Sequence, residues 1–166
     1  MTFRIPDDIM KKLKTEAETK EISLNTMVNQ ILRRYVEWGM FEPKIGMIPI
    51  PKLLVIELFE NIEKDKLFDI ASRVGKNTVS DISLFMKNKI DVPSFLSWFE
   101  TKMKNSSIEF NHTYENGIHT YVMRHDLGEN WSLYHTKILE LVFNDLLGKS
   151  IDISSTKSSL IFKCRE

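Results

Sequence analysis

The chain has 166 residues, with 23 Lys and Arg against 23 Asp and Glu, so its formal net charge at pH 7 is zero. The length fits one ordinary domain or two small ones, and 42% hydrophobic with 28% charged residues is typical of a soluble globular protein. The balanced charge excludes an overall basic bias toward nucleic acid, so any attraction to DNA must be local.

Cys164 is the only cysteine, which excludes an intrachain disulfide and a multi-cysteine zinc site. Met1 is not followed by the apolar core of a signal peptide, and no apolar run approaches membrane-spanning length. We therefore expect a cytoplasmic protein without a membrane span, and no pattern in the chain predicts a cofactor.

The first 38 residues predict a short strand and two helices. Thr2-Phe3-Arg4-Ile5 alternates apolar and polar side chains, and Pro6-Asp7-Asp8 then starts a helix with one apolar stripe, made by Ile9, Leu13 and Ala17. Ser23 is a good N-cap for a second helix, in which the apolar residues follow helical spacing: Leu24, Met27, Val28, Ile31, Leu32, Tyr35 and Val36.

A lone strand beside two helices has no neighbour for its backbone hydrogen bonds, and a unit this short makes too little core to fold alone. Antiparallel pairing with the same strand of a second chain solves both difficulties. The pattern therefore predicts an intertwined homodimer.

This arrangement resembles the ribbon-helix-helix family of DNA-binding proteins, of the MetJ and Arc type. The resemblance covers about the first quarter of the chain and rests on the residues Thr2–Asp8, Leu13, Ala17 and Ile22–Leu32. It implies that the chain binds DNA as a dimer.

The resemblance also implies roles for single residues. Thr2 and Arg4 would point outward from the two-stranded ribbon into the major groove, where Arg4 can donate a bidentate pair to guanine. Ser23, Leu24 and Asn25 would present backbone N–H groups to a phosphate. Residues 1–40 carry seven Lys and Arg against six Asp and Glu, which is a weak basic footprint for a DNA-binding unit.

Residues 41–51 contain three prolines and one glycine, which interrupt helical structure and mark a domain boundary. We predict a DNA-binding and dimerisation domain over 1–40, a Pro-rich connector over 41–51, and a second domain over 52–166. The connector is apolar enough to pack against one of the domains.

The segment 52–106 predicts helices. The first ends near Asn61, the second ends at Gly75 as a C-terminal cap, the third covers Thr78 to Lys87, and the fourth opens at Asp91-Val92-Pro93. None of them carries a paired-carboxylate, metal-ligand or phosphate-loop spacing. We therefore expect a helical layer that covers a sheet.

The segment 107–166 changes to the period of strands. Alternating runs flank the hairpin signal Glu115-Asn116-Gly117, a helix follows from Trp131 to Leu147, and two more strands surround a polar turn, Ser154–Ser159. The predicted fold class is α+β: an N-terminal ribbon-helix-helix, then a helical layer and a small antiparallel sheet in ββαββ order.

All four histidines fall in this last segment. A two-residue turn at Asn116-Gly117 pairs Tyr114 with His119 and His112 with Tyr121, so that His112, His119 and His125 share one face of the sheet. Such a cluster can bind a metal or a small ligand, although satisfied aromatic packing is the simpler interpretation. No thiolate or carboxylate is fixed beside it, so we predict no metal site.

The string His125-Asp126-Leu127-Gly128-Glu129-Asn130-Trp131-Ser132 resembles an HDLG-x-x-WS motif of an archaeal domain. The resemblance implies no activity. Physically, the string reads as a strand end, a glycine turn and a helix start, with Asp126 or Asn130 as the helix cap and Trp131 as an anchor on the sheet.

We therefore predict a homodimeric, sequence-specific transcription regulator whose C-terminal domain senses a ligand or extends the oligomer. An antitoxin-like protein, whose second domain binds a partner while the first represses its own operon, stays open as the alternative. An enzyme built on the histidines ranks last, because no nucleophile–base pair can be placed by spacing.

Overall fold

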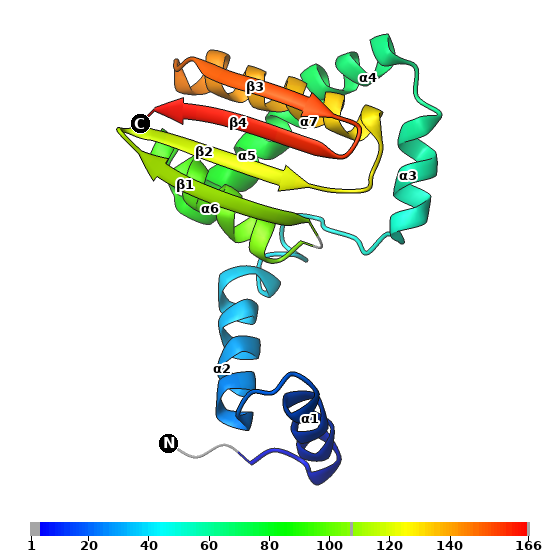
Figure 1. Cartoon of the computed structure of the whole chain (residues 1–166), viewed down its shortest axis with the longest axis vertical. Coiled ribbons are helices and arrows are strands. Elements are labelled where there is room, and N and C mark those ends of the chain that lie inside the picture. The colour runs from blue at the N-terminus through cyan, green and yellow to red at the C-terminus, as the bar shows by residue number, and fades with distance from the viewer. Residues whose placement is uncertain (1–3, 107, 166) are drawn as a thin grey trace. The chain divides into compact units, whose positions relative to one another are not determined.

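The structure is a computed structural model that describes residues 4–106 and 108–165. The chain divides into two units, Met1–Gly46 and Met47–Glu166, each described here by itself (Figure 1). In the first unit, helix α1 spans Asp7–Thr19 and helix α2 spans Leu24–Arg34, followed by a π-helical turn over Tyr35–Gly39. Thr2 and Phe3 lie outside the described residues, and Arg4 and Ile5 have no regular secondary structure, so the ribbon stays a prediction.

The second unit begins with its helices. Helix α3 spans Lys52–Glu60, α4 spans Lys64–Ile70, and a π-helical turn over Ala71–Gly75 leads directly into α5, Lys76–Lys87. Helix α6, Val92–Lys104, starts where the sequence predicts, because the Asp91 side chain accepts a hydrogen bond from the Ser94 N–H at 2.9 Å.

The remainder of the unit adds a sheet and one more helix. Strands β1, Glu109–Glu115, and β2, Ile118–Arg124, form the hairpin, helix α7 spans Glu129–Leu141, and strands β3, Ile151–Thr156, and β4, Ser159–Arg165, follow. All pairings are antiparallel, and the strand order in the sheet is β1-β2-β4-β3. The α+β class and the small antiparallel sheet are thus confirmed.

Helices α5, α6 and α7 cover one face of this sheet and leave the other face open toward the viewer of Figure 1. The core lies between the helices and the covered face, where aromatic rings from α6 meet rings from the strands. Phe99 of α6 packs edge-on against Tyr121 and Phe162, with centroids 5.5 and 5.3 Å away. Such rings contribute both buried area and pairing geometry.

Two local predictions are wrong. Gly75 is not a C-terminal cap: its backbone is helical (φ −61°), and a Cβ there would lie 2.5 Å from the Ile138 side chain, so glycine serves close helix packing. The polar segment Ser154–Ser159 is not mostly turn, because β3 continues to Thr156 and β4 begins at Ser159. The Ser and Thr side chains there are tolerated because one sheet face is open.

No helix within the described ranges is both long and apolar enough to cross a membrane.

Candidate functional site

Four of the five residues predicted to bind DNA fall within the described part of the first unit, and Thr2 lies outside it. Arg4 is exposed. Ser23 caps α2, its Oγ accepting a hydrogen bond from the Thr26 N–H at 3.0 Å, and Leu24 and Asn25 form the first turn of that helix. The N-cap prediction is therefore confirmed, whereas the contacts with DNA stay predictions.

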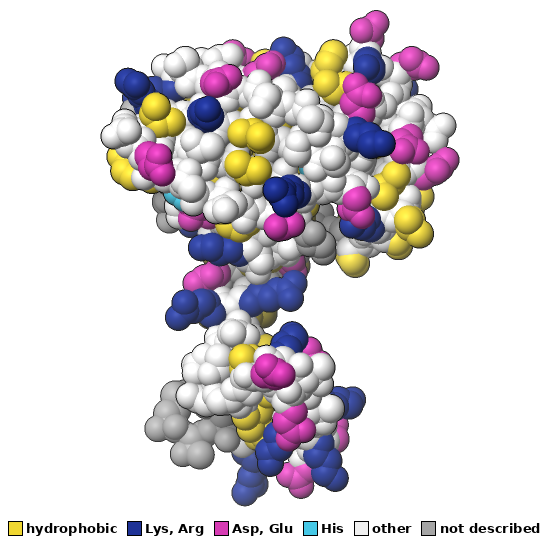
Figure 2. All heavy atoms as spheres, in the orientation of Figure 1, with side chains coloured by type: hydrophobic (Ala, Val, Ile, Leu, Met, Phe, Trp, Pro, Cys, Tyr) yellow, Lys and Arg dark blue, Asp and Glu magenta, His cyan; other side chains and the backbone are white. Residues whose placement is uncertain are grey.

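Apolar side chains on both helices of this unit are exposed in the single chain. Only Ala17 of α1 and Met27 of α2 are buried. The predicted apolar positions Ile9, Leu32, Tyr35 and Val36 keep 45%, 53%, 60% and 59% of their surface exposed. Figure 2 shows apolar side chains at the surface of this unit among charged ones. Apolar residues at the spacing of a buried helix face that stay this exposed in a single chain are compatible with an interaction site.

The hairpin of the second unit brings two of the three predicted histidines together. Its register pairs His112 with Tyr121 and Tyr114 with His119, as the sequence predicts. The ring nitrogens His112 Nε2 and His119 Nδ1 are 3.0 Å apart, and the His112 ring stacks on Tyr121 with a centroid distance of 4.2 Å. The result is a row of parallel rings along the covered sheet face.

A carboxylate from α6 lies beside this row. Glu100 Oε1 accepts a 2.7 Å hydrogen bond from the Tyr121 hydroxyl and lies 3.2 Å from His112 Nδ1. Burial, reinforced by the charge of Glu100, raises the pKa of Tyr121 above its ordinary value. Because a carboxylate only accepts, the proton of His112 is favoured at Nδ1 and its Nε2 then accepts from His119. Both ring nitrogens of His112 are therefore hydrogen-bonded to side chains of the protein.

His125 lies apart from the other two, because β2 ends at Arg124. Its Nδ1 accepts from the Leu127 N–H at 3.2 Å and its Nε2 lies 2.9 Å from Ser132 Oγ. Burial lowers the pKa of His125. The three predicted histidines thus form no common ligand set, and the residues that the structure describes contain no group of three metal-binding side chains.

The HDLG-x-x-WS segment fixes the start of α7 differently from our prediction. Neither Asp126 nor Asn130 caps the helix, whose N-cap is Gly128 with φ +87°. Asp126 forms an ion pair with Lys52, which lowers the pKa of the carboxyl. Asn130 Nδ2 donates to the carbonyls of Phe59 and Ile62 at 2.8 and 2.9 Å, and so ties α7 to the end of α3.

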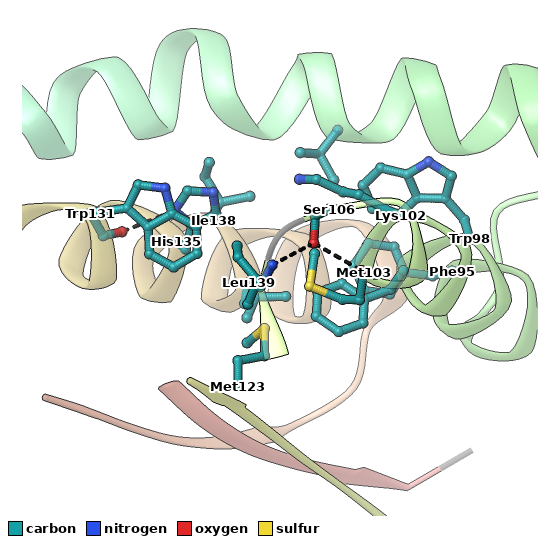
Figure 3. A pocket seen from close by; sticks show the side chains of 13 residues that line it. Phe95, Trp98, Lys102, Met103, Ser106, Met123, Trp131, His135, Ile138 and Leu139 are labelled. Atoms are coloured by element: carbon teal, nitrogen blue, oxygen red, sulfur yellow. Dashed lines mark hydrogen bonds between the residues drawn. The ribbon is translucent and has the colours of Figure 1, made fainter. Parts of the chain in front are cut away.

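A cavity of about 200 Å³ lies between helices α5, α6 and α7 and strand β2, and sequence reasoning missed it. Its wall is mostly apolar, with two ionisable side chains, Lys102 and His135. Figure 3 shows Lys102 extending from α6 toward α7, where His135 stacks on Trp131 with a centroid distance of 3.8 Å. The apolar lining includes Phe95, Trp98, Met103, Met123 and Ile138.

The pKa values of both ionisable side chains are shifted by the apolar surroundings. Burial lowers the pKa of His135 to about 3, helped by the charge of Lys102, so the imidazole is neutral at pH 7. Its Nδ1 lies 2.9 Å from the Trp131 carbonyl and is therefore the donating nitrogen. Burial also lowers the pKa of Lys102, whose Nζ lies 5.4 Å from the Trp98 ring centroid. No carboxylate among the described residues pairs with Lys102.

One sequence signal could have located this cavity. Lys102 follows Phe95, Trp98 and Phe99 at helical spacing, so it falls on the apolar stripe of α6. A lysine in that position usually extends its stem along the apolar surface and its ammonium to water. Here Lys102 is half-buried and its side chain lines the cavity.

Comparison with known proteins gives one match. Residues 1–32 match the model of the HicB family. Searches of curated proteins and of solved structures return no match.

Proposed function

We propose that the chain is an antitoxin-like protein, in which the unit Met1–Gly46 dimerises and binds operator DNA and the unit Met47–Glu166 binds a partner protein. One observation carries the proposal: residues 1–32 match HicB, an antitoxin-type family with ribbon-helix-like character. The match covers the predicted ribbon, the first predicted helix and most of the second.

The exposed apolar positions of α1, α2 and the π-helical turn after α2 support dimerisation. Ile9, Leu32, Tyr35 and Val36 follow the spacing of a buried helix face yet are about half exposed in the single chain. Burying apolar surface against a second copy gains about 25 cal/mol for each Å² removed from water. A symmetric pair would also supply the strand partner that residues 2–5 need.

Local features support DNA binding despite the neutral charge of the chain. Arg4 is exposed beside α1 and can reach a base edge from the predicted ribbon. The backbone N–H groups of Leu24 and Asn25 belong to the first turn of α2, where helix geometry provides no internal acceptor and favours a phosphate.

A second candidate is a transcription regulator whose C-terminal unit senses a ligand and needs no protein partner. The observation that favours it is that this unit has its own aromatic core and an internal cavity. An antitoxin-like segment that folds only on its partner would need neither.

Two measurements test the proposal. Full-length protein is incubated with a random-sequence DNA pool at low and high salt, and the bound fraction is sequenced. An enriched palindrome or repeat whose affinity falls with salt supports operator binding. No enrichment at either salt concentration contradicts it.

The partner is tested by co-expressing the chain with the product of each adjacent gene. An antitoxin-like function predicts that one of these products arrests growth when it is expressed alone. When it is expressed together with the chain, the same product should be harmless and should co-purify with the chain. Operator binding without any such partner would favour the second candidate.

A further inference from the structure

The cavity described above combines an apolar wall with one basic side chain, Lys102, and it lies entirely within the unit Met47–Glu166. We infer that this cavity binds a small apolar monocarboxylate, whose carboxylate pairs with Lys102 Nζ and whose apolar body fills the space between α6 and α7. The inference goes beyond the proposed function and does not depend on it.

Lys102 is half-buried where it lines the apolar cavity. A cationic side chain placed among apolar residues loses hydration, and proteins usually compensate with a paired anion. Lys102 has its aromatic neighbour Trp98 at 5.4 Å but no carboxylate partner among the described residues. Glu100, the acidic residue of α6, is engaged elsewhere, since it contacts Tyr121 and His112.

The charges of the side chains that line the cavity favour a ligand with a single negative charge. His135 is neutral at pH 7 because burial holds its pKa at about 3, and its Nδ1–H is used by the Trp131 carbonyl. Lys102 is therefore the one cationic side chain among the described residues of the lining. A dianionic phosphate would leave an unbalanced negative charge in an apolar cavity, whereas a carboxylate is neutralised by one ammonium.

The volume and the apolar lining of the cavity favour a ligand whose remaining part is small and apolar. About 200 Å³ is far more than one water occupies and is below the 300–1,000 Å³ typical of drug-sized ligands. Figure 3 shows side chains of α6, α7 and Met123 turned into the same space as the Lys102 stem. Short alkyl chains and single aromatic rings have the dimensions that fit such a wall.

The test uses full-length protein and calorimetric titration with octanoate and phenylacetate, each paired with its neutral counterpart, 1-octanol or 2-phenylethanol. We expect at least one carboxylate to bind more tightly than its alcohol. Replacing Lys102 by Met should weaken that carboxylate about tenfold or more, the loss expected for a charge-assisted contact, and leave the alcohol within about twofold.

Lys104→Met is the matched control, because Lys104 lies on the same helix with its side chain exposed. It should bind like the parent protein. If Lys102→Met does not fold by circular dichroism, Lys102→Gln replaces it, since Gln keeps a polar end without the charge.

Three results would overturn the inference. The first is no binding of either carboxylate at millimolar concentration. The second is equal affinity for a carboxylate and its alcohol in the parent protein. The third is carboxylate binding that Lys102→Met leaves unchanged in a folded protein.

Discussion

The fully buried Tyr121 of β2 donates a hydrogen bond of 2.7 Å to Glu100 of α6. The bond joins the middle of the sheet to the helix that covers it, at the point where the rings of Phe99 and Phe162 also meet Tyr121. Because a buried hydroxyl without an acceptor is costly, this contact fixes the position of α6 on the sheet.

Tyr121→Phe tests that role. The ring and its stacking on Phe162 are retained, and only the hydrogen bond to a charged acceptor is lost. We expect a loss of about 2 kcal/mol in the free energy of unfolding, measured by urea denaturation. Tyr114→Phe is the control, because Tyr114 is exposed on the same hairpin and should change stability little. Equal effects of the two substitutions would contradict the prediction.

Gly75→Ala tests the close approach of the helices. A Cβ at this position would lie 2.5 and 2.8 Å from two carbons of Ile138 and 2.9 Å from the Tyr134 hydroxyl. The backbone itself accepts alanine, so helix propensity alone would favour the substitution. We nevertheless expect a loss of about 1–3 kcal/mol by thermal or urea unfolding, because overpacking dominates.

The cause is checked by a second variant. Ile138→Ala removes the carbons that the new Cβ would meet, so the double variant should lose less stability than the sum of the two single losses. If the two losses in the free energy of unfolding simply add, the strain caused by Gly75→Ala does not come from contact with Ile138.

The hydrogen bonds of Asn130 can be tested by substitutions that remove or reverse its donor. Its Nδ2 donates to two carbonyls at the end of α3, Phe59 and Ile62. Asn130→Asp replaces this donor with an oxygen facing two other oxygens, whereas Asn130→Ala only removes the donor. We expect losses of about 1–2 kcal/mol for Ala and more for Asp, by urea denaturation at pH 7. A smaller loss for Asp than for Ala would argue against the direction of these bonds.

His135 predicts sensitivity to acid. Its pKa is about 3 in the folded protein and 6.5 when unperturbed. Below pH 6.5 the imidazole is therefore protonated in the unfolded chain but stays neutral in the folded chain. The stability present above pH 6.5 is therefore lost as the pH falls, with an upper limit of about 1.4 kcal/mol per pH unit for one proton.

The acid effect is measured by urea denaturation at intervals between about pH 7 and pH 5, above the ordinary titration range of carboxyl groups. His135→Gln should flatten the dependence, and His125, whose pKa burial also lowers, should account for part of the remainder. The charge of Lys102 also contributes to the lowered pKa of His135. An unchanged slope in His135→Gln would show that His135 is not the acid-sensitive group.

Sequence reasoning predicted the features that short-range chemistry determines. The hairpin register follows from Asn116 and Gly117, which both adopt positive φ, and the start of α6 follows from the Asp91 cap. The role of Gly75 depends on a residue 63 positions later, Ile138, and is invisible to local rules.

The candidate sites were less predictable. The grouping of His112 with His119 is a property of one hairpin, whereas the separation of His125 depends on where β2 ends. The sequence does not single out Lys102, because a lysine on an apolar helix stripe ordinarily reaches water. Only the arrangement of α5, α6, α7 and β2 in space shows that this side chain lines a cavity.

Arg4 gives the last prediction, and it rests on the proposed DNA-binding function. If the predicted ribbon enters the major groove, Arg4→Ala removes a side chain that reads bases but leaves α1, α2 and their apolar faces unchanged. We expect the variant to stay dimeric by sedimentation and to lose about 1–3 kcal/mol of discrimination between operator and random DNA. Lys12→Ala, an exposed cation of α1 outside the ribbon, is the control and should keep the preference. A variant that lacks Arg4 yet discriminates as well as the parent protein would remove this residue from the reading face.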